Sequence, residues 1–281
     1  MSHDSMFEGR KNIGNSLKTH NFIKSPKFFK LLTQIKQNYP EWSNQKKLYG
    51  KENLKKSFQS FSGINVRKVR KNSQIKKNEY YQKLIEGEHL SVQFFSDKDK
   101  TKILCVCNQI FIKRREQPFI IKALITKKID KNLAMDLSKI CLKLTKVLKL
   151  EGVCNIDIIL ESITNRIFIV ELNARPGLST NILWKISSNL FDKGLTLKKT
   201  SHNKFFATQI IYSLKEIFME RENLKYIKKL KGKKYISELP TIGQKIKKDD
   251  PICLIHLTSR KIEKLRENLE KMSYKILSNL N

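Results

Sequence analysis

Residues 168–177 read FIVELNARPG, an apolar run that ends in alternating polar side chains and a Pro-Gly turn. The first three residues are aromatic or β-branched, which favours a buried, pleated strand. Every second side chain of a strand lies on the same face, so Glu171, Asn173 and Arg175 should project together. A carboxylate, an amide and a guanidinium at the end of an apolar strand need a common partner. The sequence therefore predicts a binding site there.

The segment before this strand supplies another carboxylate. Residues 153–160, VCNIDIIL, also have strand composition, and the polar link ESIT joins the two segments as a hairpin. With a turn centred near Thr164, Asp157 lies across from Glu171. Like charges that face each other across two strands are destabilising, whereas a cation bound between them would reverse the sign of the interaction.

The ligand types indicate which cation this would be. Asp157, Glu171 and Asn173 offer only oxygen atoms, which suit Mg²⁺, and Mg²⁺ usually enters protein sites together with nucleotide phosphates. Arg175 can hold a planar anion or a developing charge with its forked donors. The alternative is a polar strand end in which Glu171 and Arg175 pair with each other.

The remaining segments predict a protein with both helices and strands. Apolar residues at helical spacing indicate helices within residues 23–37, where Ser25 is the expected N-cap, 131–150, 205–219 and 262–276. Alternating patterns indicate strands within residues 52–58, 64–69, 79–85, 89–95 and 100–114, and a strand pair within 235–257.

Length and composition indicate a globular protein. The chain has 281 residues and 40% hydrophobic content, enough for one large or two modest domains. No apolar run approaches the roughly 20 residues that span a bilayer, and the start lacks the apolar stretch of a secretory signal. Five scattered cysteines without metal-binding spacing indicate a reduced compartment. We therefore expect a cytoplasmic protein with no membrane partner.

The net charge of +31 would favour binding to polyanions at low salt. Lysine is spread along nearly the whole chain, however, as an A+T-biased coding sequence would also produce. A dedicated nucleic-acid binder concentrates its charge in a patch and interleaves stacking aromatic residues. Nucleic acid is therefore not the expected partner, and a basic nucleic-acid-binding module stays as an alternative.

The hairpin resembles the second half of the ATP-grasp fold, whose ligases carry an acidic residue on one strand and E-x-N-x-R at the end of the next. Residues 47–69, KLYGKENLKKSFQSFSGINVRKV, look like the lysine strand and phosphate loop of that fold. Residues 80–95, YYQKLIEGEHLSVQFF, look like its nucleotide hinge, and residues 238–255 resemble a C-terminal hairpin. In this order the motifs are most similar to the branch of predicted ATP-dependent carboligases.

The resemblance implies an α+β (α/β) architecture, with two lobes of antiparallel or mixed sheets that clasp a nucleotide and a small C-terminal α+β segment. The expected division is a remnant of an N-terminal region with a lead-in helix in residues 1–44, the ATP-grasp domain in 45–195, and a C-terminal segment with a β-hairpin and a terminal helix in 196–281. These ligases carry an α/β domain ahead of the grasp, and this chain begins near the end of that domain.

The resemblance also implies roles for single residues. Lys56 would contact the phosphates of ATP, and the adenine hinge would consist of Gln82, Lys83 and Leu84, acting through backbone groups. Glu88 would bind the ribose.

For the hairpin, the resemblance implies that Asp157, Glu171 and Asn173 hold Mg²⁺ or Mn²⁺. Arg175 would steady the reacting phosphoryl or acyl group, with Lys56 as the other catalytic residue. The implied reaction is an ATP-dependent ligation in which a carboxylate becomes an acyl phosphate that an amine then opens, as in cofactor biosynthesis. The expected partners are a small carboxylate and a small amine, and a homodimer is compatible with the resemblance.

The phosphate loop departs from the family pattern. The family has a glycine-rich loop whose backbone N–H groups close over the phosphates, whereas residues 57–63 read SFQSFSG and retain only Gly63. Either Ser57, Ser60 and Ser62 replace some of those contacts, or the loop is slower, or the site is degraded. A catalytically impaired ATP-binding homologue is therefore a second alternative.

Overall fold

The computed structural model describes residues 26–44, 53–58, 63, 65–69, 74–97, 100–112, 116–186, 203–231 and 235–280. These residues form two compact units. The first unit holds the described residues up to Ile121 together with Lys127–Gly177, and the second holds Lys122–Thr126 and the described residues from Leu178 onward.

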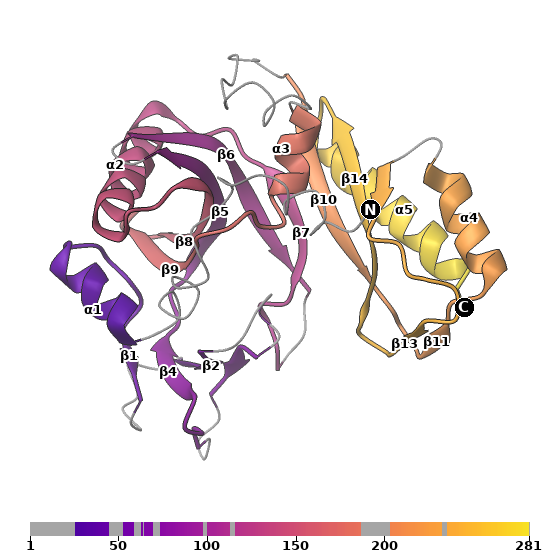
Figure 1. Cartoon of the computed structure of the whole chain (residues 1–281), viewed down its shortest axis with the longest axis horizontal. Coiled ribbons are helices and arrows are strands. Elements are labelled where there is room, and N and C mark those ends of the chain that lie inside the picture. The colour runs from indigo at the N-terminus through magenta and orange to yellow at the C-terminus, as the bar shows by residue number, and fades with distance from the viewer. Residues whose placement is uncertain are drawn as a thin grey trace. The chain divides into compact units, whose positions relative to one another are not determined.

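The first unit contains two groups of antiparallel strands (Figure 1). A small sheet has the order β1-β4-β2-β3, formed by β1 (Trp42–Ser43), β2 (Asn53–Ser57), β3 (Arg67–Lys68) and β4 (Glu79–Lys83). A group of longer strands has the order β6-β5-β8-β9, formed by β5 (Gly87–Asp97), β6 (Lys100–Phe111), β8 (Gly152–Glu161) and β9 (Ile167–Asn173). The helices of this unit are α1 (Pro26–Gln34) and α2 (Lys131–Leu148).

The core of the first unit is built from α1, α2 and one face of the longer strands. Helix α2 begins where the Asp130 carboxylate accepts a hydrogen bond of 2.8 Å from the Leu133 N–H, and it ends where Lys149 adopts a left-handed φ of 52°. The apolar side chains of α2 and of alternate strand positions are buried together. Each large apolar side chain buried in this way stabilises the fold by roughly 1.5–3 kcal/mol.

The second unit has the strand order β12-β14-β10-β7, in which the pairs β12–β14, β14–β10 and β10–β7 are antiparallel. Its elements are β7 (Ile121–Thr126), α3 (Thr180–Ile186), β10 (Phe205–Tyr212), β11 (Ile217–Phe218), α4 (Arg221–Lys231), β12 (Tyr235–Ser237), β13 (Lys245–Ile246), β14 (Pro251–Ser259) and α5 (Ile262–Ser278). Helix α5 covers β10 and β14, and the Gln209 amide donates to the Ser273 hydroxyl at 2.5 Å.

Most of the predicted elements are confirmed, with one error. The expected helices appear as α1, α2 and α5, the hairpin appears as β8 and β9, and the expected Ser25 cap lies outside the described residues. The helix predicted within residues 205–219 is wrong, because this segment forms β10 and β11. Strand β10 lies between β7 and β14 and is buried on both faces, so its apolar run FFATQIIY lacks the alternation that marks a half-exposed strand.

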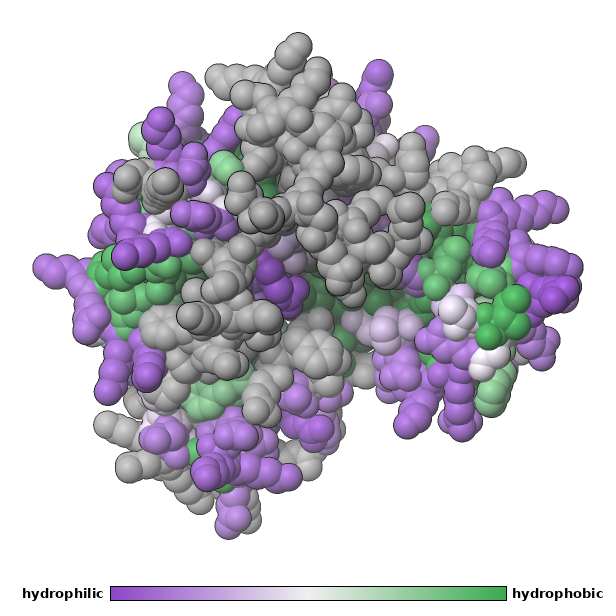
Figure 2. All heavy atoms as spheres, in the orientation of Figure 1, coloured by the Kyte–Doolittle hydropathy of each residue, from purple (hydrophilic) through white to green (hydrophobic). Residues whose placement is uncertain are grey.

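The surface of both units is rich in polar side chains. On the face seen in Figure 2, hydrophilic residues are spread over both units and do not gather in one area. In the described part of the chain, no helix is both long enough and apolar enough to cross a bilayer. The cysteines form no disulfide there.

Candidate functional site

The β8–β9 hairpin brings the predicted polar residues together. The register pairs Asp157 with Glu171 and Asn155 with Asn173, so the predicted opposition of the two carboxylates is confirmed. Between Asp157 and Ile158 the register shifts by one residue, which leaves Val170 as an extra residue in β9.

This bulge decides which face the polar residues occupy. Ile169 and Leu172 are three positions apart, yet both are buried in the core, which a regular strand with a two-residue period would not allow. The extra residue between them restores the alternation, and it therefore turns Glu171 and Asn173 away from the core.

Two further polar residues support Asp157. The Asn155 amide donates to Asp157 Oδ1 at 2.9 Å, and the Ser91 hydroxyl donates to Asn155 Oδ1 at 2.9 Å. The sequence interpretation missed both, although Asn155 stands two positions before Asp157 in the same strand and shares its face. These contacts hold the Asp157 carboxylate in one orientation.

The electrostatics of Asp157 fit a cation ligand. Burial raises the pKa of Asp157 to about 6, and the facing Glu171 carboxylate adds to the rise, while hydrogen bonds from Asn155, Ser91 and Gln109 lower it. A bound cation would relieve both unfavourable effects. Within the described residues, no group of three or more His, Cys, Asp or Glu side chains could hold a metal by itself. The oxygen atoms of Asp157, Glu171 and Asn173 could hold a divalent cation together with oxygen atoms of a bound phosphate.

Lys56 lies on the small sheet and binds the side chain of Gln82. Its ammonium group donates to Gln82 Oε1 at 2.7 Å, and the Gln82 amide donates to the Pro40 carbonyl at 3.3 Å. Gln82 is buried, so its side chain does not face the solvent. Burial and then the Glu171 carboxylate raise the pKa of Tyr80, the strand partner of Lys56. The face of β4 that carries Tyr80 therefore lies close to the hairpin.

The predicted hinge connects β4 to β5. Lys83 ends β4, and its backbone N–H donates to the Glu41 carbonyl at 2.8 Å, while Leu84 follows in the link to β5. Gly87 begins β5 so close to β8 that an added Cβ would lie 2.2 Å from the Leu160 carbonyl oxygen. Only glycine fits this contact, and the end of the hinge is therefore fixed against the hairpin.

The structure does not bring Glu88 to the face that carries Asp157. Both Glu88 carboxylate oxygens lie 2.7 Å from the Lys127 ammonium nitrogen, and Glu88 shares the face of the core residue Leu90. The neighbouring His89 instead shares the face of Ser91.

His89 is a residue that the sequence interpretation missed. Burial lowers the pKa of His89 to about 4, and the Lys56 cation adds to the effect, so the imidazole is neutral near pH 7. Its ring lies 5.0 Å from the Phe111 ring and 5.2 Å from the Phe119 ring, measured between centroids. The strand alternation could have indicated His89, because it stands two residues before Ser91.

The altered phosphate loop is described at its two ends. Ser57 is half-buried at the end of β2, whereas Ser60 and Ser62 lie outside the described residues. Gly63 has a φ of +75°, and an added Cβ would lie 1.7 Å from the Phe119 carbonyl oxygen. The retained glycine is thus required by a close backbone contact.

Arg175 follows the strand end in a bend. Its side chain is exposed and donates to the Pro176 carbonyl at 3.4 Å, while the preceding Ala174 is buried in the core. The guanidinium is therefore accessible to a ligand near the hairpin.

The site geometry agrees with what sequence comparison shows. The family model described as the ATP-grasp domain matches residues 23–179, which is more than half of the chain and includes every residue of the site. The chain belongs to the ATP-grasp family. The α+β architecture predicted for it is confirmed.

Known ATP-grasp proteins resemble this chain to different extents. The D-alanine–D-alanine ligase of Prochlorococcus marinus is 33% identical over 70 residues, which cover 24% of this chain and 20% of that ligase. The crystal structure of an L-amino acid ligase from Bacillus licheniformis aligns with a TM-score of 0.70 and 13% identity, over 92% of this chain and 71% of that one. The N5-carboxyaminoimidazole ribonucleotide synthetase from Thermotoga maritima aligns with a TM-score of 0.65 and 14% identity, over 92% and 73%. The structural matches establish the fold.

Proposed function

We propose that this ATP-grasp chain is an ATP-dependent ligase that joins a small carboxylate to a small amine. The observation that carries the proposal is the opposition of Asp157 and Glu171 on one half-buried face, where burial and mutual repulsion raise the pKa of Asp157 to about 6. Such a carboxylate pair needs a cation, and Mg²⁺ usually binds together with nucleotide phosphates. The ligases among the similar proteins support the same reaction class.

In this proposal the metal ligands are Asp157, Glu171 and Asn173. Mg²⁺ or Mn²⁺, when bound, neutralises part of the phosphate charge. Lys56 would contact the phosphates, since its ammonium group lies on the face of the small sheet near the hairpin. Arg175 would stabilise charge that develops on the transferred group, as its forked donors are accessible.

The proposed reaction has two steps. A substrate carboxylate oxygen attacks the γ-phosphorus of ATP, and ADP leaves to give an acyl phosphate. The amine then attacks the acyl carbon, phosphate leaves, and the amine nitrogen loses a proton. The protein contributes mainly by positioning the reactants and neutralising their charge, because phosphoryl transfer asks for little covalent chemistry from side chains. We also propose a cytoplasmic location, which suits cysteines without disulfides.

A second candidate, an ATP-binding homologue with impaired catalysis, is favoured by the serine-containing loop before Gly63. It predicts nucleotide binding without turnover for any pair of substrates. Gly63 nevertheless has a positive φ and lies so close to the Phe119 carbonyl that no larger residue would fit, so the end of the loop keeps a backbone conformation that only glycine allows.

A trapping assay separates the two candidates. The purified protein is incubated with Mg-ATP, a panel of small carboxylates and hydroxylamine, which captures acyl phosphates as hydroxamates. Ligase activity predicts that ADP and hydroxamate form together with at least one carboxylate and that both are lost in Glu171→Ala. ATP binding without ADP release across the panel would favour the impaired homologue.

A further inference from the structure

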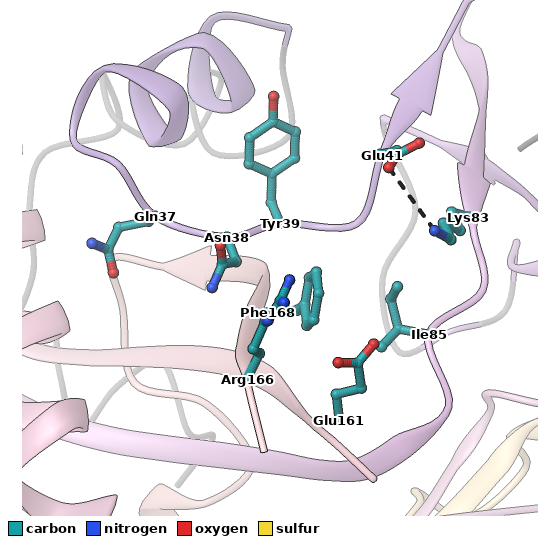
Figure 3. Close-up of a pocket in the computed structure, with 9 residues that line it drawn as sticks. All are labelled: Gln37, Asn38, Tyr39, Glu41, Lys83, Ile85, Glu161, Arg166 and Phe168. Carbon is teal, nitrogen blue, oxygen red and sulfur yellow. Dashed lines mark ion pairs between the residues drawn. The ribbon is translucent and has the colours of Figure 1, made fainter. Parts of the chain in front are cut away.

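A cavity of about 350 Å³ lies in the first unit where three segments meet (Figure 3). These segments are residues 37–41 after α1, the hinge near Lys83, and the tip of the β8–β9 hairpin. Its volume falls in the range of roughly 300–1,000 Å³ that is typical of small-molecule sites. The cavity shares Lys83 with the expected adenine hinge, but neither Asp157 nor Glu171 lines it.

Main-chain hydrogen bonds hold the walls of this cavity together. The Lys83 N–H donates to the Glu41 carbonyl at 2.8 Å, which joins the hinge to the segment after α1. The Ile169 N–H donates to the Asn38 carbonyl at 2.9 Å, which joins the same segment to the edge strand β9. Because the backbone fixes all three walls, the cavity is a built feature whose shape depends on the hinge.

Charges of both signs line the cavity. Glu41 and Lys83 face each other with 3.9 Å between Oε1 and Nζ, and both side chains are substantially exposed. Arg166 and Glu161 lie on the hairpin beside the ring of Phe168 (Figure 3). Within the described part of the chain, the Arg166 guanidinium forms no ion pair, so its N–H groups can bind an external anion.

Apolar side chains complete the lining. Phe168 contributes an aromatic ring, and Ile85 contributes a buried aliphatic side chain from the hinge. The ring of Tyr39 points away from these residues (Figure 3) and stacks on Phe29 of α1. A ligand that satisfies this lining carries an anion, a cation and an apolar group within a few bond lengths of one another. A free amino acid with an apolar side chain has this combination.

We propose that this cavity is an effector site for such an amino acid. Its carboxylate binds the fork of Arg166, its ammonium group binds the Glu161 carboxylate, and its side chain packs against Phe168 and Ile85. A bound amino acid contacts Lys83 and Ile85, and it therefore changes the affinity of the hinge for nucleotide. By linkage, the nucleotide changes the amino-acid affinity by the same factor. Only this coupling rests on the proposed function, because binding to the cavity does not require ATP.

Calorimetric titration of the full chain without nucleotide tests the binding. The probes are L-phenylalanine, phenylacetate, which lacks the amino group, and phenethylamine, which lacks the carboxylate. Phenylacetate loses the contact with Glu161, and phenethylamine loses the contact with Arg166. Each of them should therefore bind roughly tenfold more weakly than L-phenylalanine.

Two variants assign the contacts. Arg166→Gln should remove the preference for L-phenylalanine over phenethylamine, and Glu161→Gln should remove the preference over phenylacetate. Arg260→Gln, at an exposed position in the other unit, is the charge control and should bind all three probes as the wild type does. Arg166 is exposed, so its replacement should leave the thermal unfolding midpoint unchanged.

The absence of L-phenylalanine binding at millimolar concentration would overturn the proposal. Direct competition between ATP and L-phenylalanine would also overturn it, since the cavity would then be part of the nucleotide site. A protein that binds L-phenylalanine but not ATP would refute the proposed ligase function and leave the amino-acid site intact.

Discussion

Replacement of Asp157 by asparagine should stabilise the ligand-free protein at neutral pH while it removes a metal ligand. Burial and the Glu171 carboxylate raise the pKa of Asp157 in the folded protein, so the folded state holds the proton more tightly than the unfolded chain does. The ionised carboxylate therefore destabilises the fold. Asparagine has nearly the same shape and carries no charge.

The size of the effect follows from the pKa. The rise from 3.8 to about 6 corresponds to at most about 3 kcal/mol of unfolding free energy, because each pKa unit is worth about 1.4 kcal/mol. The destabilisation is absent below the unfolded-chain pKa of 3.8, grows as the pH rises, and is complete above about 6. The difference in unfolding free energy between Asp157→Asn and the wild type should therefore develop between pH 3.8 and about pH 6.

The measurement is chemical denaturation of both proteins at a series of pH values, without nucleotide or divalent cations. Asp136→Asn is the matched control, because Asp136 is exposed on α2 and, among the residues that the structure describes, pairs only with Lys139 at 3.5 Å. An exposed pair of this kind contributes about 0–1 kcal/mol, so the control should follow the wild type closely.

Identical pH profiles for the wild type and Asp157→Asn would refute this reasoning. That result would mean that Asp157 titrates as it does in the unfolded chain, and the need for a cation between the two strands would disappear.

Glycine replacements test the loop contact. Gly63→Ala should reduce ATP affinity at least roughly tenfold. Gly243→Ala should leave ATP affinity unchanged and should lower the free energy of unfolding by only the roughly 1–2 kcal/mol that a left-handed backbone costs. Both glycines have positive φ, but only at Gly63 would the new Cβ meet a backbone atom, so equal effects on nucleotide binding would contradict the loop assignment. A second pair tests the two faces of β5: Glu88→Gln should leave ATP affinity within about twofold, because Glu88 binds Lys127 on the core-facing side. His89→Ala should weaken ATP binding at a pH where the wild-type imidazole is neutral. A nucleotide titration in which Glu88→Gln weakens ATP binding and His89→Ala does not would show that Glu88 is the ligand.

The hairpin could be predicted because its pattern is local. Apolar residues, a polar link and the spacing of Asp157 and Glu171 determine the pairing once the turn is placed. The bulge at Val170 could not be read from the sequence, because a run of isoleucine and valine does not show where one residue drops out of register.

Two differences between sequence and structure have related causes. The resemblance assigns ribose binding to Glu88, whereas the alternation of β5 places His89, and not Glu88, on the face of Asp157. The sequence of β10 resembles a helix because burial on both faces of the strand erases the period-two pattern. The cavity at the hinge joins residues about 130 positions apart in sequence, such as Glu41 and Phe168, and no local pattern could have shown it.

The central claim is tested most directly by titrating ATP into the wild type and Glu171→Ala, each with and without Mg²⁺. If the hairpin holds the metal of a Mg-ATP complex, Mg²⁺ should strengthen ATP binding in the wild type and should have little effect in the variant. An equal gain from Mg²⁺ in both proteins would show that the metal is bound elsewhere.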